Sequence, residues 1–242
     1  MIFLLDAGNT RIKWALADGG QWLDRGALSL AEVGELGHVA AQWPGVKRAL
    51  LANVAGSAIG AAITDALRPW QGRCRWFQSS PACAGLRNGY EDYRTLGCDR
   101  WAAMIGAWSR LGTACLVVNA GTAMTGDLIF PEGEGALFRG GVILPGYDLM
   151  RQSLYRNAAQ LPLAEGHWQA LPRNTHDAIV SGCLQAMAGA VERLHRQLPP
   201  GSPCVLSGGT ADLLAPLLDL PLLRLDNLVL EGLARVAALD DA

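Results

Sequence analysis

The fold is decided by the stretch MIFLLDAGNT at residues 1–10, in which an apolar run leads directly into a small polar turn. An apolar run bounded by Gly and Asn predicts a buried strand that enters a tight turn. Residues 11–17 predict a second strand rather than a helix, because the run ends at Gly19-Gly20 and has no cap. The tip of this hairpin therefore carries a carboxylate, a glycine, an amide and a hydroxyl.

The groups at this tip suit a phosphate. Asp6 can hold a hydrated magnesium ion, Gly8 lets backbone N–H groups approach an oxyanion, and Asn9 and Thr10 can donate hydrogen bonds. Gly, Asn and Asp are also the usual turn formers for steric reasons, so this turn alone would indicate only an ordinary hairpin.

A related pattern recurs in the stretch ACLVVNAGTAMTGDLI at residues 114–129, where a second apolar strand enters a small polar turn. Gly8 and Gly121 occupy similar places in the two patterns and are 113 residues apart. Two such units predict an internal duplication, with one phosphate-binding loop in each half and a nucleotide held by both loops.

The predicted elements follow the same order in both halves. The first half has strands at 2–6, 11–17, 21–29, 47–54 and 73–78, helices at 31–42 and 57–68, and a further helix that opens within residues 96–101 and runs to about residue 111. The second half has strands at 114–119, 123–130, 136–144 and 203–207, and helices at 146–156, 174–197, 210–218 and 227–239. This order predicts an α/β fold of two mixed-sheet domains with flanking helices, 1–113 and 114–242, and a ligand-binding cleft between them.

Composition excludes several classes of protein. A chain of 242 residues with 50% hydrophobic content is not disordered, and a net charge of −2 offers no attraction for nucleic acid or anionic membrane. The apolar start meets Asp6 after five residues and has no leading positive charge, so we expect no signal peptide. The uncharged stretch 49–64 is too short to span a bilayer. Six cysteines without a CxxC pair and scattered histidines predict no zinc site and a reducing, cytoplasmic location.

The stretch LGCDRW at residues 96–101 opens a predicted helix that runs to about Leu111. Asp99 lies where a helix-capping or first-turn acid is expected, a role that stabilises a helix end by about 1 kcal/mol. Asp99 is equally suited to act as a general base, with Arg100 as an anchor for an anion or carboxylate. The residues alone leave both roles open.

Four ordered motifs resemble those of the type III pantothenate kinases, which include the proteins called Bvg accessory factors. The motifs are Asp6-x-Gly8-Asn9-Thr10-x-x-Lys13, Gly97-x-Asp99-Arg100, Gly121-Thr122-Ala123-x-Thr125 and Gly140-Gly141-x-Ile143-x-Pro145-Gly146. The resemblance implies the duplicated, ribonuclease H-like fold of the acetate and sugar kinase, Hsp70 and actin superfamily. It also implies transfer of the γ-phosphoryl group of ATP to pantothenate, which yields 4'-phosphopantothenate in the first step of coenzyme A synthesis.

The resemblance further implies roles for single residues. Asp99 would be the catalytic base, Asp6 would organise magnesium, and residues 205–210 would approach the adenosine. The implied ATP-binding residues are Asp6, Ala7, Gly8, Asn9, Thr10, Arg11, Ile12, Lys13, Gly121 and Thr122. The implied substrate-binding residues are Tyr90, Gly97, Cys98, Asp99, Arg100 and Thr175, in a pocket that family members complete across a homodimer interface.

One residue departs from the family pattern. Family members commonly carry an aspartate at the position of Asn119, where the carboxylate helps to bind an activating potassium or ammonium ion. An amide keeps an oxygen ligand but lacks the charge, so we expect weak or absent dependence on a monovalent cation.

Two other functions remain open from the residues. One is a kinase of the same superfamily that acts on a sugar or acetate, against which the Gly97-x-Asp99-Arg100 motif argues. The other is a non-catalytic ATP-binding regulator, which Asn119 favours and the intact Asp6, Lys13 and Asp99 disfavour.

Overall fold

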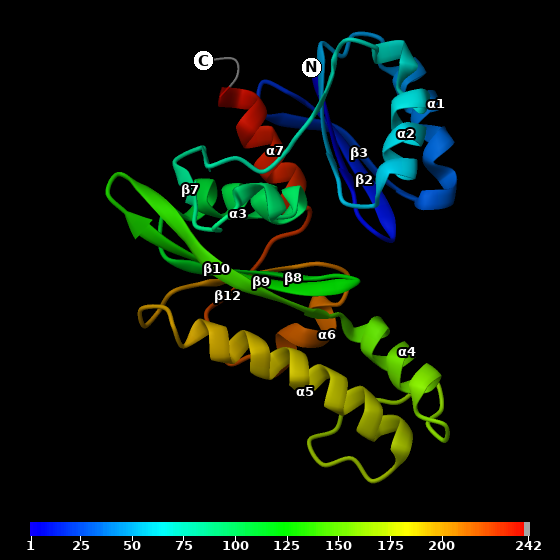
Figure 1. The fold of residues 1–242 in the computed structure, drawn as a ribbon, viewed down its shortest axis with the longest axis vertical. Coiled ribbons are helices and arrows are strands. Elements are labelled where there is room, and N and C mark those ends of the chain that lie inside the picture. Colours follow the sequence, from blue (N-terminus) through cyan, green and yellow to red (C-terminus); the bar gives the residue numbers. More distant parts are fainter. Residues whose placement is uncertain (240–242) are drawn as a thin grey trace. The chain divides into compact units, whose positions relative to one another are not determined.

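The computed structural model describes residues 1–239 and divides the chain into two compact units (Figure 1). Unit 1 comprises Met1–Gly112, Glu132–Phe138 and the segment that begins at Asn227, whereas unit 2 comprises Thr113–Pro131 and Arg139–Asp226. The hairpin segment and the last helix belong to unit 1, although residues of unit 2 precede both in the chain.

Unit 1 is built on a five-stranded mixed sheet with the order β3-β2-β1-β4-β5. The strands are β1 (Ile2–Ala7), β2 (Arg11–Asp18), β3 (Gln21–Ser29), β4 (Arg48–Asn53) and β5 (Cys74–Trp76). Strands β1, β2 and β3 form an antiparallel meander, and β4 pairs in parallel with both β1 and β5. The sheet therefore begins with hairpins and continues through helical crossovers, as expected from the element order.

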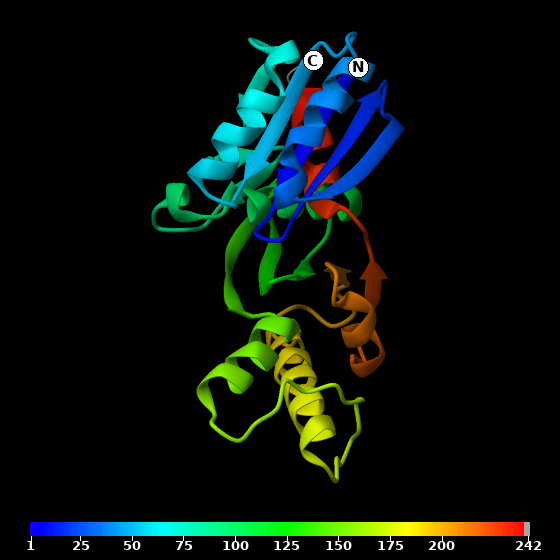
Figure 2. The same cartoon turned by 90° about the vertical axis from the view of Figure 1, so that its right-hand side faces the viewer.

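Helices cover both faces of this sheet (Figures 1 and 2). On one face, α1 (Leu36–Gln42), preceded by the 3-10 turn η1 (Leu30–Glu35), and α2 (Ser57–Ala66) cover a core that contains Phe3, Ile12 and Trp70. On the other, α3 (Cys98–Leu111) and α7 (Leu228–Leu239) pack together. Their packing leaves no room for larger side chains, because a Cβ on Gly106 would lie 2.8 Å from the Leu228 carbonyl oxygen.

Unit 2 repeats the strand order of unit 1. Five strands in the order β12-β11-β8-β9-β10 belong to a seven-stranded sheet that continues beyond β10 with two short strands. The five are β8 (Cys115–Ala120), β9 (Ala123–Glu132), β10 (Gly135–Pro145), β11 (Cys204–Ser207) and β12 (Leu222–Arg224). Strand β8 is antiparallel to β9 and parallel to β11, as β1 is to β2 and β4. This correspondence confirms the predicted duplication.

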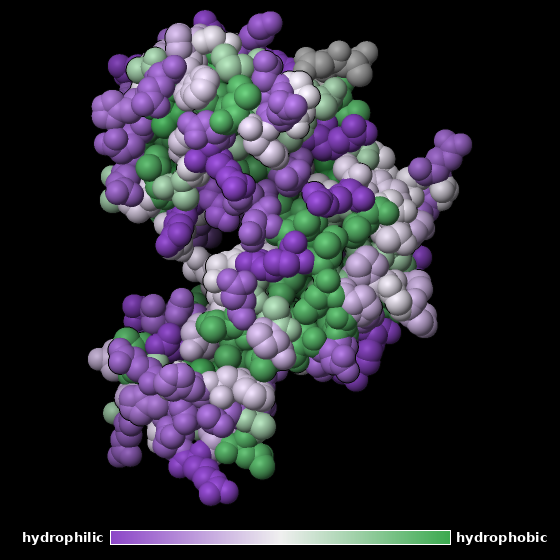
Figure 3. Space-filling view, turned by 180° about the vertical axis from the view of Figure 1, so that it is seen from behind, coloured by the Kyte–Doolittle hydropathy of each residue, from purple (hydrophilic) through white to green (hydrophobic). Residues whose placement is uncertain are grey.

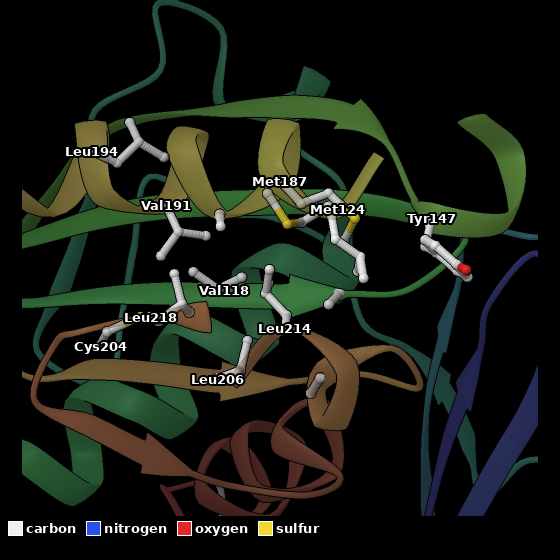
Figure 4. Packing of buried hydrophobic residues seen from close by; sticks show 14 of the residues in the cluster. Val118, Met124, Tyr147, Met187, Val191, Leu194, Cys204, Leu206, Leu214 and Leu218 are labelled. Atoms are coloured by element: carbon white, nitrogen blue, oxygen red, sulfur yellow. The ribbon is translucent and has the colours of Figure 1, made fainter. Parts of the chain in front are cut away.

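The helices of unit 2 bury one face of its sheet. They are α4 (Tyr147–Asn157), α5 (Thr175–His195) and α6 (Ala211–Leu214), the last continued by the 3-10 turn η4 (Ala215–Leu217). Figure 4 shows Val191 and Met187 of α5 pointing toward Val118 of β8 and Leu206 of β11. Leu116, Val118 and Ala120 alternate along β8 and face this core, and the strand is buried over most of its length, as expected of an apolar run.

Some short elements have no clear signal in the sequence. These are β12, the strands β6 (Ala82–Cys83) and β7 (Leu86–Asn88), and the 3-10 turns η2 (Arg68–Trp70) and η3 (Tyr93–Thr95). Strand β7 exists because it pairs with Ala136–Phe138 of β10, so its presence depends on a partner about 50 residues away. Elements of two or three residues are too short to show a periodic pattern.

No helix within residues 1–239 is both long and apolar enough to cross a bilayer. Hydrophobic residues are nevertheless exposed among hydrophilic ones on the face shown in Figure 3. Those exposed in unit 2 include Leu149, Leu154, Tyr155, Leu163, Trp168 and Leu171.

Candidate active site

The β1–β2 loop places Asp6 opposite Lys13 on the neighbouring strand, because Ala7 pairs with Ile12 at the end of the hairpin. Side chains that face each other across an antiparallel pair project from the same side of the sheet. Gly8 closes the loop by donating its N–H to the Arg11 carbonyl oxygen at 3.0 Å. The carboxylate and the ammonium group predicted for phosphate chemistry are therefore close together.

Side chains of the loop differ in how much they are exposed. Asn9, Thr10 and Arg11 are exposed, whereas Ala7 and Ile12 are buried in the core of unit 1, so the latter two offer a ligand only their backbone. A Cβ on Gly8 would lie 3.6 Å from the Arg11 carbonyl oxygen, which is an ordinary contact. The fold itself thus tolerates a side chain at residue 8, and a need for glycine would come from a ligand.

The negative charge of Asp99 acts on Asp6. Burial, the largest effect, and the charge of Asp99 raise the pKa of Asp6, the positive charge of Lys13 lowers it, and together they bring it to about 7. Burial also raises the pKa of Asp99, against the hydrogen bond from the Arg100 N–H and the positive charge of Arg100. The result is a half-buried pair of carboxylates with an excess of negative charge.

Asp99 combines a helix-end position with proximity to Asp6. Helix α3 begins at Cys98, and Asp99 in its first turn accepts a hydrogen bond from the Arg100 N–H at 2.8 Å. A Cβ on Gly97 would lie 2.6 Å from Asp99 Oδ1, so glycine at residue 97 leaves space for the carboxylate. The two roles that the residues left open are structurally compatible, because one carboxylate has two oxygens.

Arg100 and Tyr90 contact each other directly. The guanidinium Nη1 of Arg100 donates to the Tyr90 hydroxyl at 2.8 Å, and both residues also lie near Phe138. Tyr90 is held from its backbone, because its N–H donates to Asn88 Oδ1 at 3.1 Å. Tyr90 and Arg100 were expected at this site from the sequence. Asn88 and Phe138 were not expected there, because neither belongs to one of the four motifs.

Gly97 and Cys98 line a pocket of about 720 Å³ in unit 1, together with residues of α2 and of the segment after β5. The Cys98 thiol lies 3.7 Å from the Asn53 carbonyl oxygen, and burial raises its pKa to about 11. The thiol is therefore protonated at neutral pH and unsuited to nucleophilic chemistry. Sequence reasoning missed Asn53, Trp76 and Arg94 of this pocket.

The second predicted loop joins β8 to β9 in unit 2 and is braced by the backbone. Gly121 donates its N–H to the Ala123 carbonyl oxygen at 3.2 Å, and Gly146 donates to the Thr122 carbonyl oxygen at 2.9 Å. Gly208 packs against Ala120 with a φ of +104°, a conformation that favours glycine. Gly121 and Gly146, which come from two different motifs, thus meet at the β8–β9 loop.

Asn119 lies in register with Thr125 of β9 and Ser207 of β11. Side chains at paired positions on adjacent strands project from the same face, so three neutral polar groups line up across three strands. Thr125 and Ser207 are buried, and Asn119 is half-buried.

Thr175 begins α5 in unit 2, after the N-cap Asn174, whose side chain accepts a hydrogen bond from the Asp177 N–H at 2.9 Å. Thr175 lines a pocket of about 910 Å³ whose other lining residues, from α4, α5 and the segment before α5, are mostly apolar. Tyr90, Cys98, Asp99 and Arg100 belong to unit 1 and Thr175 to unit 2.

Among residues 1–239, no group of three or more His, Cys, Asp and Glu side chains could hold a metal ion by itself. None of the six cysteines forms a disulfide in this part of the chain.

Comparison with known proteins gives consistent results. A family model described as type III pantothenate kinase matches residues 2–197. The type III pantothenate kinase of Aromatoleum aromaticum is 53% identical over 244 aligned residues, which cover 100% of both chains. That of Azoarcus sp. is 49% identical over 246 residues, which cover 100% of this chain and 92% of the relative.

A solved structure from Sinorhizobium meliloti, provisionally named a 2-dehydro-3-deoxygalactonokinase, is similar with a TM-score of 0.67 at 13% identity, covering 99% of both chains. At that identity the likeness concerns the fold alone.

Proposed function

Because the chain belongs to the type III pantothenate kinase family, we propose that it transfers the γ-phosphoryl group of ATP to the primary hydroxyl of pantothenate. The product is 4'-phosphopantothenate, and the reaction is the first step of coenzyme A synthesis. The observation that carries the proposal is the close pair of carboxylates Asp6 and Asp99, with Lys13 beside Asp6.

This arrangement suits phosphoryl transfer, which asks a protein mainly for positioning and for neutralisation of charge. We assign Asp99 as the base that accepts the proton of the pantothenate hydroxyl. Its raised pKa brings the carboxyl closer to neutral pH, which favours proton transfer. Arg100 and Tyr90 are assigned to hold the acceptor, and the backbone of Gly97 and Cys98 borders the same region.

The donor set around Asp6 fits a divalent cation, because two adjacent carboxylates with one ammonium group leave negative charge that a cation can neutralise. We propose Mg²⁺, with Asp6 as the carboxylate that organises it. When bound with ATP, the ion neutralises developing charge on the phosphate oxygens. Lys13 supplies a further positive charge from the chain itself.

The two loops are assigned to the phosphates of ATP. In unit 1 the exposed Asn9, Thr10 and Arg11 provide hydrogen-bond donors, while Gly8, whose N–H is bonded to the Arg11 carbonyl oxygen, leaves room for the ligand to approach the backbone. In unit 2 we assign Thr122 as the corresponding donor, Gly121 to the close approach of the backbone, and residues 205–210 to the adenosine. The chain has no GxxxxGK[ST] motif, so phosphate binding rests on these loops.

We also propose a cytoplasmic homodimer in which Thr175 contributes to the pocket of the partner subunit. The exposed apolar side chains of α4 and residues 158–174 support it, since Leu149, Leu154, Tyr155 and Leu171 are costly to leave in water. Size-exclusion chromatography with light scattering should give a mass that is twice the 25.7 kDa of one chain. A mass of one chain across the working concentration range would contradict the dimer.

The activity is tested by following ADP release from purified protein with pantothenate as the only acceptor, with and without potassium. We expect turnover that requires ATP, a divalent metal and pantothenate, and a product heavier than pantothenate by one phosphoryl group. Acetate and hexose sugars serve as control acceptors, because activity on them instead would indicate another kinase of the superfamily. ATP binding without turnover on any acceptor would indicate the non-catalytic regulator.

A further inference from the structure

The tip of the β9–β10 hairpin, Glu132–Phe138, is part of unit 1, and its β10 residues pair with strand β7. Ala136, Leu137 and Phe138 pair in parallel with Leu86, Arg87 and Asn88. Two glycines permit this approach, because a Cβ on Gly135 would overlap the Gly85 carbonyl and one on Gly89 would overlap the Phe138 carbonyl. The pairing places Phe138 opposite Asn88, and Asn88 in turn holds the backbone of Tyr90.

Phe138, Tyr90 and Arg100 form one compact cluster. The two rings have centroids 5.3 Å apart, and the Arg100 guanidinium carbon lies 5.6 Å from the centre of Tyr90 and 6.0 Å from that of Phe138. Phe138 is fully buried, and Arg100 is only 6% exposed. A cation within about 6 Å of a ring face is attracted by its quadrupole, most strongly where water is excluded.

We propose that Phe138 is a positioning residue for the acceptor site, because its ring holds the Arg100 guanidinium against the Tyr90 hydroxyl. The proposal rests on the assignment of Arg100 to the acceptor. A guanidinium on a flexible stem has many rotamers in solution, and the two aromatic rings and the hydrogen bond to Tyr90 limit the directions that it can take. The acceptor then meets a preorganised charge and does not have to order it on binding.

A purely structural role of Phe138 predicts a different pattern from a positioning role. Any loss of a buried ring lowers stability, since removal of apolar volume leaves a cavity. It would reduce the concentration of active protein and so lower the apparent kcat. A loosened Arg100 raises the KM for the acceptor and leaves the KM for ATP unchanged.

The hairpin offers a matched control. Arg139, next to Phe138, has its guanidinium carbon 4.3 Å from the centre of the Phe130 ring, in unit 2. Phe130→Leu therefore removes an aromatic face from an arginine of the same hairpin without touching Arg100. Phe138→Leu and Phe138→Met remove the ring at the proposed position, and Phe138→Tyr keeps it.

We expect Phe138→Leu and Phe138→Met to raise the KM for pantothenate about ten-fold, with the KM for ATP unchanged. Phe138→Tyr and Phe130→Leu should keep the wild-type KM for pantothenate. An unchanged KM in Phe138→Leu, or an equal rise in Phe138→Tyr and Phe138→Leu, would overturn the proposal.

A second measurement does not depend on turnover. The side-chain Nε–Hε signal of Arg100, assigned by its loss in Arg100→Lys, should be shifted upfield by the rings and should move downfield in Phe138→Leu. A signal that stays in place in folded Phe138→Leu overturns the positioning role. Wild-type protein that fails to phosphorylate pantothenate would refute the proposed function instead, and this signal would still decide whether Phe138 holds Arg100.

Discussion

The β1–β2 and β8–β9 loops occupy the same place in two copies of one sheet, yet their side chains differ in charge. Strand β1 places Asp6 between Lys13 of β2 and Ala52 of β4. Strand β8 places Asn119 between Thr125 of β9 and Ser207 of β11. The duplication thus preserved the backbone scaffold, while the first loop concentrates charge and the second presents neutral polar groups.

The backbones of the two loops also differ. Four residues separate the paired Ala7 and Ile12, whereas three separate the paired Ala120 and Met124. Each loop is braced at its first strand, by the Val54 N–H on the Ala7 carbonyl and by the Thr210 N–H on the Ala120 carbonyl, and the second loop has a further hydrogen bond from the Gly146 N–H. Loop 1 is therefore longer and carries exposed donors, and loop 2 is held more tightly by its own unit. We infer that the chemical step depends on unit 1 and that loop 2 mainly supports nucleotide binding.

The largest effect is expected from Asp99→Asn. The amide keeps the size of the side chain but cannot accept the acceptor proton, so kcat should fall by about 10³-fold, within the usual range for a general base. Because burial already disfavours the ionised form, the melting temperature should be unchanged or higher. Initial rates and thermal unfolding measure the two effects.

The matched control is Asp148→Asn. Asp148 is the first-turn acid of α4, which follows the Gly146 that braces loop 2, just as Asp99 is the first-turn acid of α3. This exposed acid should be replaceable without loss of rate. An equal loss of rate in both variants would show that the rate depends on an acid in the first turn of a helix and that Asp99 does not act as a base.

Asp6→Asn makes the first loop resemble the second and should lower kcat/KM for ATP by roughly 10²-fold, since a charge-assisted metal contact is lost. The same change should stabilise the ligand-free protein. The pKa of Asp6 is about 7 in the folded protein, above the ordinary aspartate value of 3.8. The wild-type protein therefore loses stability as the pH rises from about 4 to 7. The variant lacks this loss, and its advantage should reach on the order of 2 to 4 kcal/mol above pH 7.

Urea unfolding of both proteins at pH 4, 6 and 8, without nucleotide or divalent metal, measures this difference. The advantage of Asp6→Asn should be small at pH 4 and largest at pH 8. A difference that does not change with pH would contradict the raised pKa of Asp6.

Gly208→Ala tests the bracing of the second loop. A Cβ at residue 208 would overlap the Ala120 carbonyl, and the φ of +104° is unfavourable for alanine, so the variant should lose about 2 to 4 kcal/mol of stability. Gly209→Ala is the neighbouring control, because no atom lies within 4 Å of its Cβ. Equal stability of the two variants in denaturant unfolding would show that loop 2 is not held in this way.

The smallest effect is expected from Asn119→Asp, which gives the second loop the charge of the first. We expect wild type to respond weakly to potassium and the variant to be activated several-fold more, because a carboxylate is the stronger cation ligand. Initial rates with potassium chloride are compared with rates at the same concentration of sodium chloride. Strong activation of wild type would show that Asn119 is no obstacle to the cation.

Local sequence patterns predicted most of the fold. The strands of both meanders and the helices α2, α3 and α5 lie within a few residues of their predicted bounds, because each has an apolar period and a clear terminus. The predicted helix 210–218 is instead the short α6 followed by a 3-10 turn with Pro216 near its start. Proline cannot donate the next helical hydrogen bond, which accounts for the break.

The sequence by itself determined the two strand–turn–strand units, the helix whose first turn contains Asp99 and the motifs that resemble one kinase family. These features depend on residues close together in the chain, where period and turn chemistry are visible. Only the tertiary structure decided that α7 packs on α3, that Asp99 raises the pKa of Asp6, and that Phe138 lies against Arg100. Each of these contacts joins residues far apart in the chain, and chain folding alone brings such residues together.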